Sequence, residues 1–88
     1  MKFEFDPAKS AANQAKHGID FDAAQVLWQD ANALVLPARE RGEARRMLIA
    51  RHEGQYWSAI FTERGDRVRI ISVRRARENE KAAYDSQG

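Results

Sequence analysis

The chain has 88 residues, 43% of them hydrophobic and 32% charged, with a net charge of +2 and no cysteine. These values predict one globular domain over residues 1–88 and exclude disulfides and thiolate zinc sites. No apolar run is long enough for a signal peptide or a membrane helix, which favours a cytoplasmic protein that makes no contact with membranes.

The charge is unevenly distributed along the chain. Net charge is −2 over residues 1–38, +6 over residues 39–77 and −2 over the rest, and all eleven arginines lie in the middle segment. A guanidinium group binds phosphate as a rigid fork, so this segment favours a phosphate-rich partner such as nucleic acid. An ordinary solvated strand face with alternating charges accounts for the composition equally well.

The first elements are a short strand and a helix. Phenylalanines alternate in Lys2–Phe5, which predicts a strand. Asp6 and Pro7 are typical of a helix start, and Gly18 supplies the left-handed stop after about His17. A stripe of alanines predicts the face that lies against the sheet: Ala8, Ala11, Ala12 and Ala15.

A polar face of the same helix carries Lys9, Asn13 and Lys16. His17 lies in the last turn, where an imidazolium is also favoured for structural reasons, and Asn13 could serve only to bridge the helix to a strand. Asp20 is expected to cap a second helix, approximately Phe21–Gln29, that completes a helical hairpin on one face of the sheet.

Four further strands and a helix are predicted. Residues 31–36 and 45–51 form two strands, separated by a charged, flexible connection over residues 38–43. Two apolar runs, residues 56–61 and 68–73, flank a polar break and form a central β-hairpin. Residues 76–84 form a weakly apolar helix that is mobile or docks on a partner.

The predicted element order is therefore βααββββα. Because the links between strands are short, the sheet is expected to be antiparallel throughout, in an α+β fold with the helical hairpin on one face and a C-terminal helix. No nucleotide-binding loop, metal-ligand cluster or nucleophile elbow is present, so no cofactor or metal is expected. His52 is interpreted as a solvated turn residue.

Basic residues around the last strand suggest chemistry on phosphate. The start of the last helix, with Arg74 or Arg75, would bind a phosphate group. Metal-independent RNA cleavage needs a base for the 2′-hydroxyl, cations for the charge on phosphate and an acid for the leaving oxygen. The catalytic candidates are His17, Lys16, Arg74 and Glu80, with Glu80 orienting an arginine. The RNA-binding candidates are Lys9, Arg64, Arg67, Arg69, Arg75 and Arg77.

Two groups of residues, in this order and spacing, resemble the BrnT family of toxins from type II toxin–antitoxin modules. The first group is Phe5, Asp6, Pro7, Lys9, Asn13, Lys16, His17, Gly18 and Phe21. The second group is Ile70, Ile71, Ser72, Arg74, Arg75, Ala76 and Glu80. The resemblance implies a RelE-like ribonuclease fold and RNA cleavage that halts translation and growth.

The resemblance also implies a partner. A BrnA-like antitoxin with a ribbon-helix-helix domain would neutralise the toxin in a hetero-oligomer, and this complex would bind operator DNA and repress the shared operon. Two alternatives remain open from the residues: a non-catalytic module that holds nucleic acid, and an interaction protein whose arginines pair with an acidic antitoxin.

Overall fold

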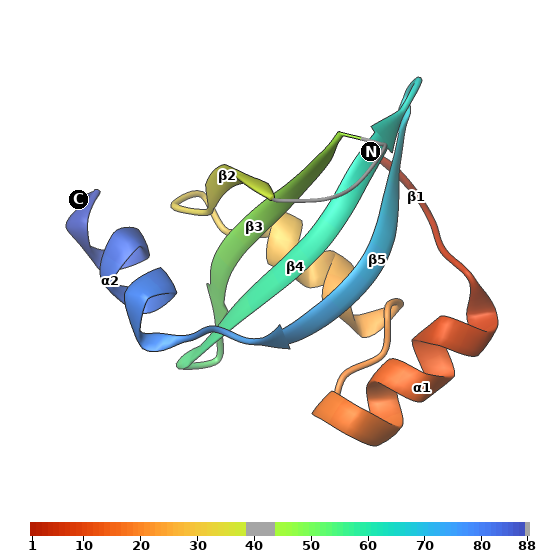
Figure 1. Ribbon diagram of the computed structural model, residues 1–88, viewed down its shortest axis with the longest axis horizontal. Coiled ribbons are helices and arrows are strands. Elements are labelled where there is room, and N and C mark those ends of the chain that lie inside the picture. The colour runs from red at the N-terminus through yellow and green to blue at the C-terminus, as the bar shows by residue number, and fades with distance from the viewer. Residues whose placement is uncertain (39–43, 88) are drawn as a thin grey trace.

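The computed structural model describes residues 1–38 and 44–87. The elements in chain order are β1 (Lys2–Glu4), α1 (Pro7–His17), the 3₁₀ helix η1 (Ala23–Gln29), β2 (Leu34–Ala38), β3 (Arg45–His52), β4 (Gln55–Arg64), β5 (Arg67–Arg75) and α2 (Glu78–Ser86) (Figure 1). This is an α+β architecture with one five-stranded sheet. The predicted flexible connection falls largely on residues 39–43, outside the described residues.

The sheet has the strand order β1-β5-β4-β3-β2 and is mixed. Strands β2 to β5 pair antiparallel, but β1 pairs parallel with β5, with Phe3 opposite Val68. The prediction of a wholly antiparallel sheet was therefore wrong. Short links constrain only strands that follow one another in the chain, whereas β1 and β5 are separated by every other strand, which permits parallel pairing.

The main core lies between the sheet and the segment that runs from Ile19 through η1. Phe21 and Leu27 are almost completely buried and pack with strand residues of β3, β4 and β5. Trp28 is partly buried and contacts Phe3 and Phe61 edge-on, with ring centroids 5.1 and 5.4 Å apart. In Figure 1, η1 crosses behind β3, β4 and β5, so this layer covers one face of the sheet.

The predicted start and stop of α1 are present, whereas α2 is Glu78–Ser86 rather than residues 76–84. The carboxylate of Asp6 accepts a hydrogen bond from the Ala8 N–H, and Gly18 ends α1 with a φ of 79°. Asp20 accepts from the Ala23 N–H at 2.8 Å. The second helix is a 3₁₀ helix that begins at Ala23, rather than an α-helix that begins at Phe21. No helix among the described residues is long and apolar enough to cross a membrane.

The buried face of α1 is polar, so the predicted role of its alanine stripe was wrong. All four alanines are exposed, whereas Ser10 and Asn13 are buried. The reason lies in β5, because β1 pairs only with Arg67–Arg69 and leaves the rest of that strand edge without a neighbour. The helix that covers such an edge must supply hydrogen-bonding groups rather than methyl groups.

Asn13 supplies those groups. Its side-chain amide donates to the Val73 carbonyl at 2.9 Å and accepts from the Val73 N–H at 3.1 Å, as a neighbouring strand would. The same amide donates to the Ile19 carbonyl at 2.8 Å. The interpretation that Asn13 bridges the helix to a strand is confirmed.

Replacing Asn13 by alanine should be strongly destabilising. The change would leave buried backbone groups of Val73 and Ile19 without partners, and each unsatisfied group costs about 1–3 kcal/mol. We expect the free energy of unfolding in urea to fall by roughly 3 kcal/mol or more. Gln14→Ala, which removes an exposed amide on the same helix, is the control. Equal midpoints for the two variants would contradict this account.

Candidate functional site

Arg74 and Glu80 form a two-armed ion pair where β5 gives way to α2. Arg74 donates from Nη1 to Oε1 at 2.8 Å and from Nη2 to Oε2 at 2.9 Å. Two further groups donate to Oε1 of Glu80, the Ser58 hydroxyl at 2.9 Å and the Arg77 N–H at 2.8 Å. The Glu80 side chain is only 8% exposed, so this carboxylate is a buried and fully hydrogen-bonded group.

These contacts fix the charges of the pair. The hydrogen bonds from Arg74, with those of Arg77 and Ser58, lower the pKa of Glu80 to about 2 against the opposing effect of burial. The bond to Glu80 raises the pKa of Arg74. At neutral pH the pair is therefore a carboxylate and a guanidinium, and Glu80 is held in the form that orients an arginine.

One edge of the Arg74 guanidinium remains open. Nη1 uses its second N–H on the Arg75 carbonyl at 3.3 Å, so three of the five N–H groups are bonded within the part of the chain that the structure describes. The other two, on Nε and Nη2, share one edge of the planar group. The side chain is 23% exposed. A phosphate could therefore be bound at this edge while Glu80 holds the adjacent one, formed by Nη1 and Nη2.

The last turn of α1 lies against the same end of β5. Asn13 is bonded to Val73, the residue before Arg74, and α1 packs on β5. His17 follows Asn13 by one helical turn on the same face, about 6 Å further along the helix. Lys16 is exposed and His17 is half-buried. The fold therefore brings the last turn of α1 to the region of Arg74, and Lys9 lies about 10 Å from Lys16 along the helix axis.

The predicted RNA-binding arginines do not form one cluster. Arg64 and Arg67 pair across the tip of the β4–β5 hairpin, about 24 Å along the strand from Arg74. Arg69 is bound to Glu4 at 2.9 Å. Arg75 stacks over the Trp57 ring, 4.9 Å from its centroid, and Arg77 precedes the first turn of α2. Only Arg75 and Arg77 lie beside Arg74 in the chain.

Sequence reasoning missed Ser58. The structure makes its hydroxyl a completely buried donor to Glu80. A signal was present, because a serine inside an apolar strand needs a buried hydrogen-bond partner. The sequence could not say that this partner lies 22 residues away on another element.

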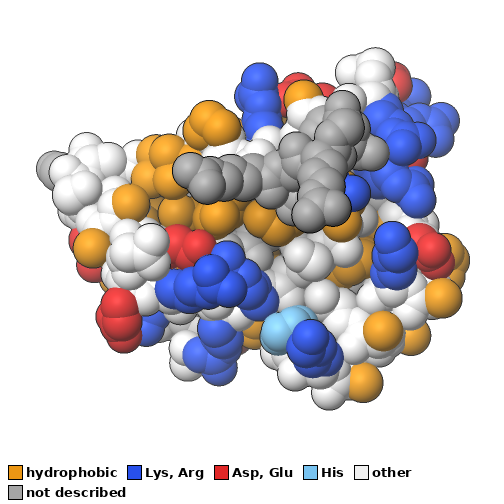
Figure 2. Space-filling view, viewed as in Figure 1, with side chains coloured by type: hydrophobic (Ala, Val, Ile, Leu, Met, Phe, Trp, Pro, Cys, Tyr) orange, Lys and Arg blue, Asp and Glu red, His pale blue; other side chains and the backbone are white. Residues whose placement is uncertain are grey.

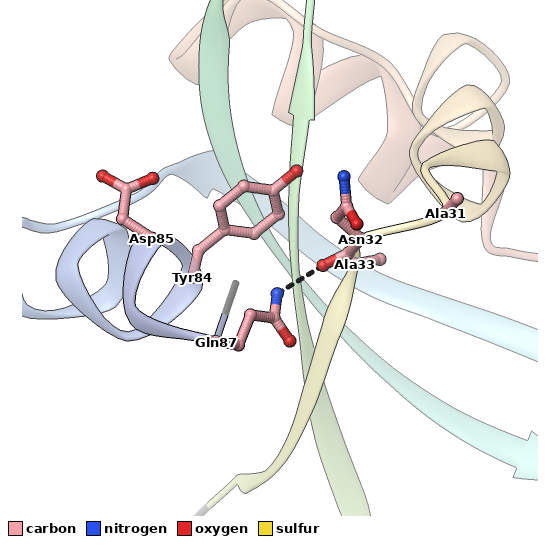
Figure 3. A pocket seen from close by; sticks show the side chains of 6 residues that line it. All are labelled: Ala31, Asn32, Ala33, Tyr84, Asp85 and Gln87. Atoms are coloured by element: carbon pink, nitrogen blue, oxygen red, sulfur yellow. Dashed lines mark hydrogen bonds between the residues drawn. The ribbon is translucent and has the colours of Figure 1, made fainter.

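A hollow of about 310 Å³ lies elsewhere, between the residues that precede β2 and the end of α2 (Figure 3). Its lining comprises Ala31, Asn32, Ala33, Tyr84, Asp85 and Gln87. The Gln87 amide bonds the Asn32 carbonyl across it. No lysine or arginine is among these residues, so the hollow is unsuited to phosphate. Within residues 1–38 and 44–87, no group of three or more His, Cys, Asp or Glu side chains could hold a metal ion.

Comparison with known proteins gives one family. Residues 5–80 match the family described as ribonuclease toxin, BrnT, of type II toxin–antitoxin system. The match begins just before the cap of α1 and ends at Glu80, so it spans all the candidate catalytic residues. No curated protein matches the chain.

Proposed function

Since the chain belongs to the BrnT family of ribonuclease toxins from type II toxin–antitoxin systems, we propose that it is a metal-independent endoribonuclease with a RelE-like fold that cleaves cytoplasmic RNA and so stops translation and growth. The observation that carries the proposal is the Arg74–Glu80 pair, which fixes a guanidinium with one open edge beside the last turn of α1. A cation held in a fixed position stabilises the negative charge that develops on a phosphate in the transition state.

In this mechanism each candidate residue has one task. Arg74 binds the reacting phosphate and stabilises its developing charge, with Lys16 as a second cation. His17 moves a proton, either from the attacking 2′-hydroxyl or to the leaving 5′-oxygen. Glu80 does not exchange protons, because its pKa is about 2, and it acts as a positioning residue for Arg74. The bond from phosphorus to the 5′-oxygen breaks as the bond to the 2′-oxygen forms.

The remaining cations would guide the RNA backbone. Lys9, Arg75 and Arg77 are exposed and belong to the elements around Arg74. Arg64 and Arg67 at the hairpin tip would contact RNA further from the cleaved bond, and Arg69 would contribute less because Glu4 neutralises it. Sequence-independent phosphate contacts of this kind supply affinity that decreases as salt rises.

The family also implies an antitoxin partner. We propose a BrnA-like antitoxin with a ribbon-helix-helix domain, which binds the toxin in a hetero-oligomer and carries it to operator DNA to repress the operon. The toxin itself would contact DNA only within that complex. A toxin without its antitoxin would then be free to act on RNA.

Cleavage should proceed with EDTA present, because the proposed electrostatic groups are side chains. We expect purified protein to convert a labelled RNA into fragments that end in a 2′,3′-cyclic phosphate and a 5′-hydroxyl, with rates that agree within about twofold with and without chelator. Gel analysis with enzymatic probing of the ends would measure this. The control is the same RNA with 2′-deoxy sugars, which lacks the nucleophile and should stay intact.

Two results would contradict the proposal. If EDTA abolished cleavage and an added divalent cation restored it, the mechanism would depend on a metal ion rather than on side chains alone. RNA binding without any new ends, in a well-folded preparation, would favour the alternative of a non-catalytic nucleic-acid or antitoxin-binding module.

A further inference from the structure

The face of the sheet opposite η1 is apolar at its centre and, among the described residues, incompletely covered. Side chains alternate along strands, and Leu48, Ala59 and Val73 face the main core. The residues next to them in each strand therefore form the second face, where Leu36, Met47 and Ile60 are linked by the strand pairing. Four aliphatic residues of this face are half-buried: Leu34, Leu36, Met47 and Ile60. Since β4 is the central strand, an exposed part of Ile60 means that none of the described helices and strands fully covers this face.

We call these four residues the aliphatic patch. In Figure 2, hydrophobic side chains gather over β2 and the adjoining strand, with Lys and Arg side chains on either side of them. The helix α2 covers only one end of this face, where Glu80 bonds Ser58 and Tyr84 contacts Tyr56. The patch continues to the candidate site, because Ile60 pairs with Ser72, two residues before Arg74.

Arginines surround the patch on the same face. The strand alternation that places Met47 and Ser58 there also places Arg45 and Arg51 of β3 and Arg74 of β5 on this side. Beyond the bulge at Ile60, the same alternation adds Arg64, Arg67 and Arg69. Among these arginines, Arg74 is paired with Glu80 and Arg69 with Glu4. The second face is thus an aliphatic centre with a basic rim.

This combination fits a protein segment better than RNA. Unpaired bases bind by stacking on exposed aromatic rings, and the patch is aliphatic. The aromatic residue that β4 places on this face, Tyr56, is already in contact with Arg51, Lys81 and Tyr84. An amphipathic segment with aliphatic side chains along its centre and acidic ones at its edges would match both the patch and the rim.

We propose that the aliphatic patch is the docking site for an amphipathic, acidic segment of the antitoxin, which lies across β2, β3 and β4 and covers the open edge of Arg74. The proposal rests on the proposed function for the consequence it draws, namely that docking blocks phosphate binding. The contact itself requires only the antitoxin partner that the family implies.

The test is a pair of neighbouring substitutions on β2. Leu36→Asp places a carboxylate in the patch, while Val35→Asp places one on the opposite face of the same strand, where Val35 is 43% exposed. With the antitoxin encoded in the same operon as titrant, calorimetry should give a Kd at least about 30-fold weaker for Leu36→Asp, and within about twofold of wild type for Val35→Asp.

A second measurement uses the unmodified protein, so that it does not depend on a variant folding. The chain has two methionines, Met47 in the patch and Met1 at the other end of the sheet, 82% exposed. With ¹³C-methyl methionine, the Met47 resonance should shift or broaden when antitoxin is added, and the Met1 resonance should stay unchanged. A Met47 signal that does not move would place the antitoxin elsewhere and overturn the proposal.

Other outcomes are equally decisive. Equal loss of affinity for both variants would mean that the antitoxin pairs with the free edge of β2 instead. Weaker RNA binding by Leu36→Asp with unchanged antitoxin binding would make the patch an RNA contact. If wild type binds antitoxin as expected but never cleaves RNA, the proposed function fails while the docking site stands.

Discussion

Replacing His17 by alanine is expected to slow RNA cleavage by about 10²–10⁴-fold, the range that one general acid or base contributes. Induced expression of this variant should no longer arrest growth, and total RNA should stay intact. The fold should tolerate the change, because a histidine in the last turn of a helix stabilises by only about 0.3–1 kcal/mol. Antitoxin binding should therefore be retained.

The chain provides a matched control in its other histidine. His52 is the last residue of β3, with its Nε2 3.4 Å from the exposed Glu53 carboxylate, and its replacement by alanine should leave toxicity unchanged. The residual activity of His17→Ala should also lose one limb of the pH–rate profile, an effect that a purely structural role would not produce. Growth arrest of equal strength from both variants and wild type would remove His17 from the mechanism and leave it as a helix-terminal residue.

Replacing Glu80 by alanine is expected to cost roughly 3 kcal/mol of folding stability, because it leaves the partly buried Arg74 guanidinium and the buried Ser58 hydroxyl without their partner. Cleavage should fall as well, since Arg74 would lose its fixed position. Urea unfolding would measure the first effect and RNA cleavage under native conditions the second. Glu78→Ala is the control, because that side chain is 92% exposed and pairs only with Lys81.

The same carboxylate should make stability depend on pH. The pKa of Glu80 is lowered from 4.5 to about 2 in the folded protein, so its stabilising effect is complete above the unfolded value and is lost as pH falls from about 4.5 towards 2. We expect the stability gap between wild type and Glu80→Gln to shrink by about 2 kcal/mol between pH 6 and pH 3. A gap that stays constant over this interval would show that Arg74 does not hold Glu80 ionised.

Local signals in the sequence were sufficient for most of the elements. The cap at Asp6, the stop at Gly18 and the central hairpin each depend on a few adjacent residues, and the structure contains all of them. The parallel β1–β5 pair and the polar buried face of α1 depend on which strand edge lacks a neighbour. That is a property of the assembled sheet, so no local pattern could predict it.

The candidate site was accessible from the sequence only in part. Arginine at a strand end followed by a glutamate in the next helix suggested that Glu80 orients an arginine, and Arg74 is now seen to be that residue. The arginines of the middle segment were interpreted as one surface, but strand geometry separates the hairpin tip from Arg74 and turns Arg75 towards Trp57. The composition gives the number of arginines in this segment, but not the end or face of the sheet on which each arginine lies.

The pairing of β1 with β5 also has a consequence for biosynthesis. The bonds between Asn13 and Val73 join residues 60 positions apart, and β1 meets its partner strand across a similar separation. Contacts this distant in sequence form slowly and cannot form at all until the ribosome has released the later strand. A nascent chain would therefore be unable to bring α1 and Arg74 together until β5 has left the ribosome.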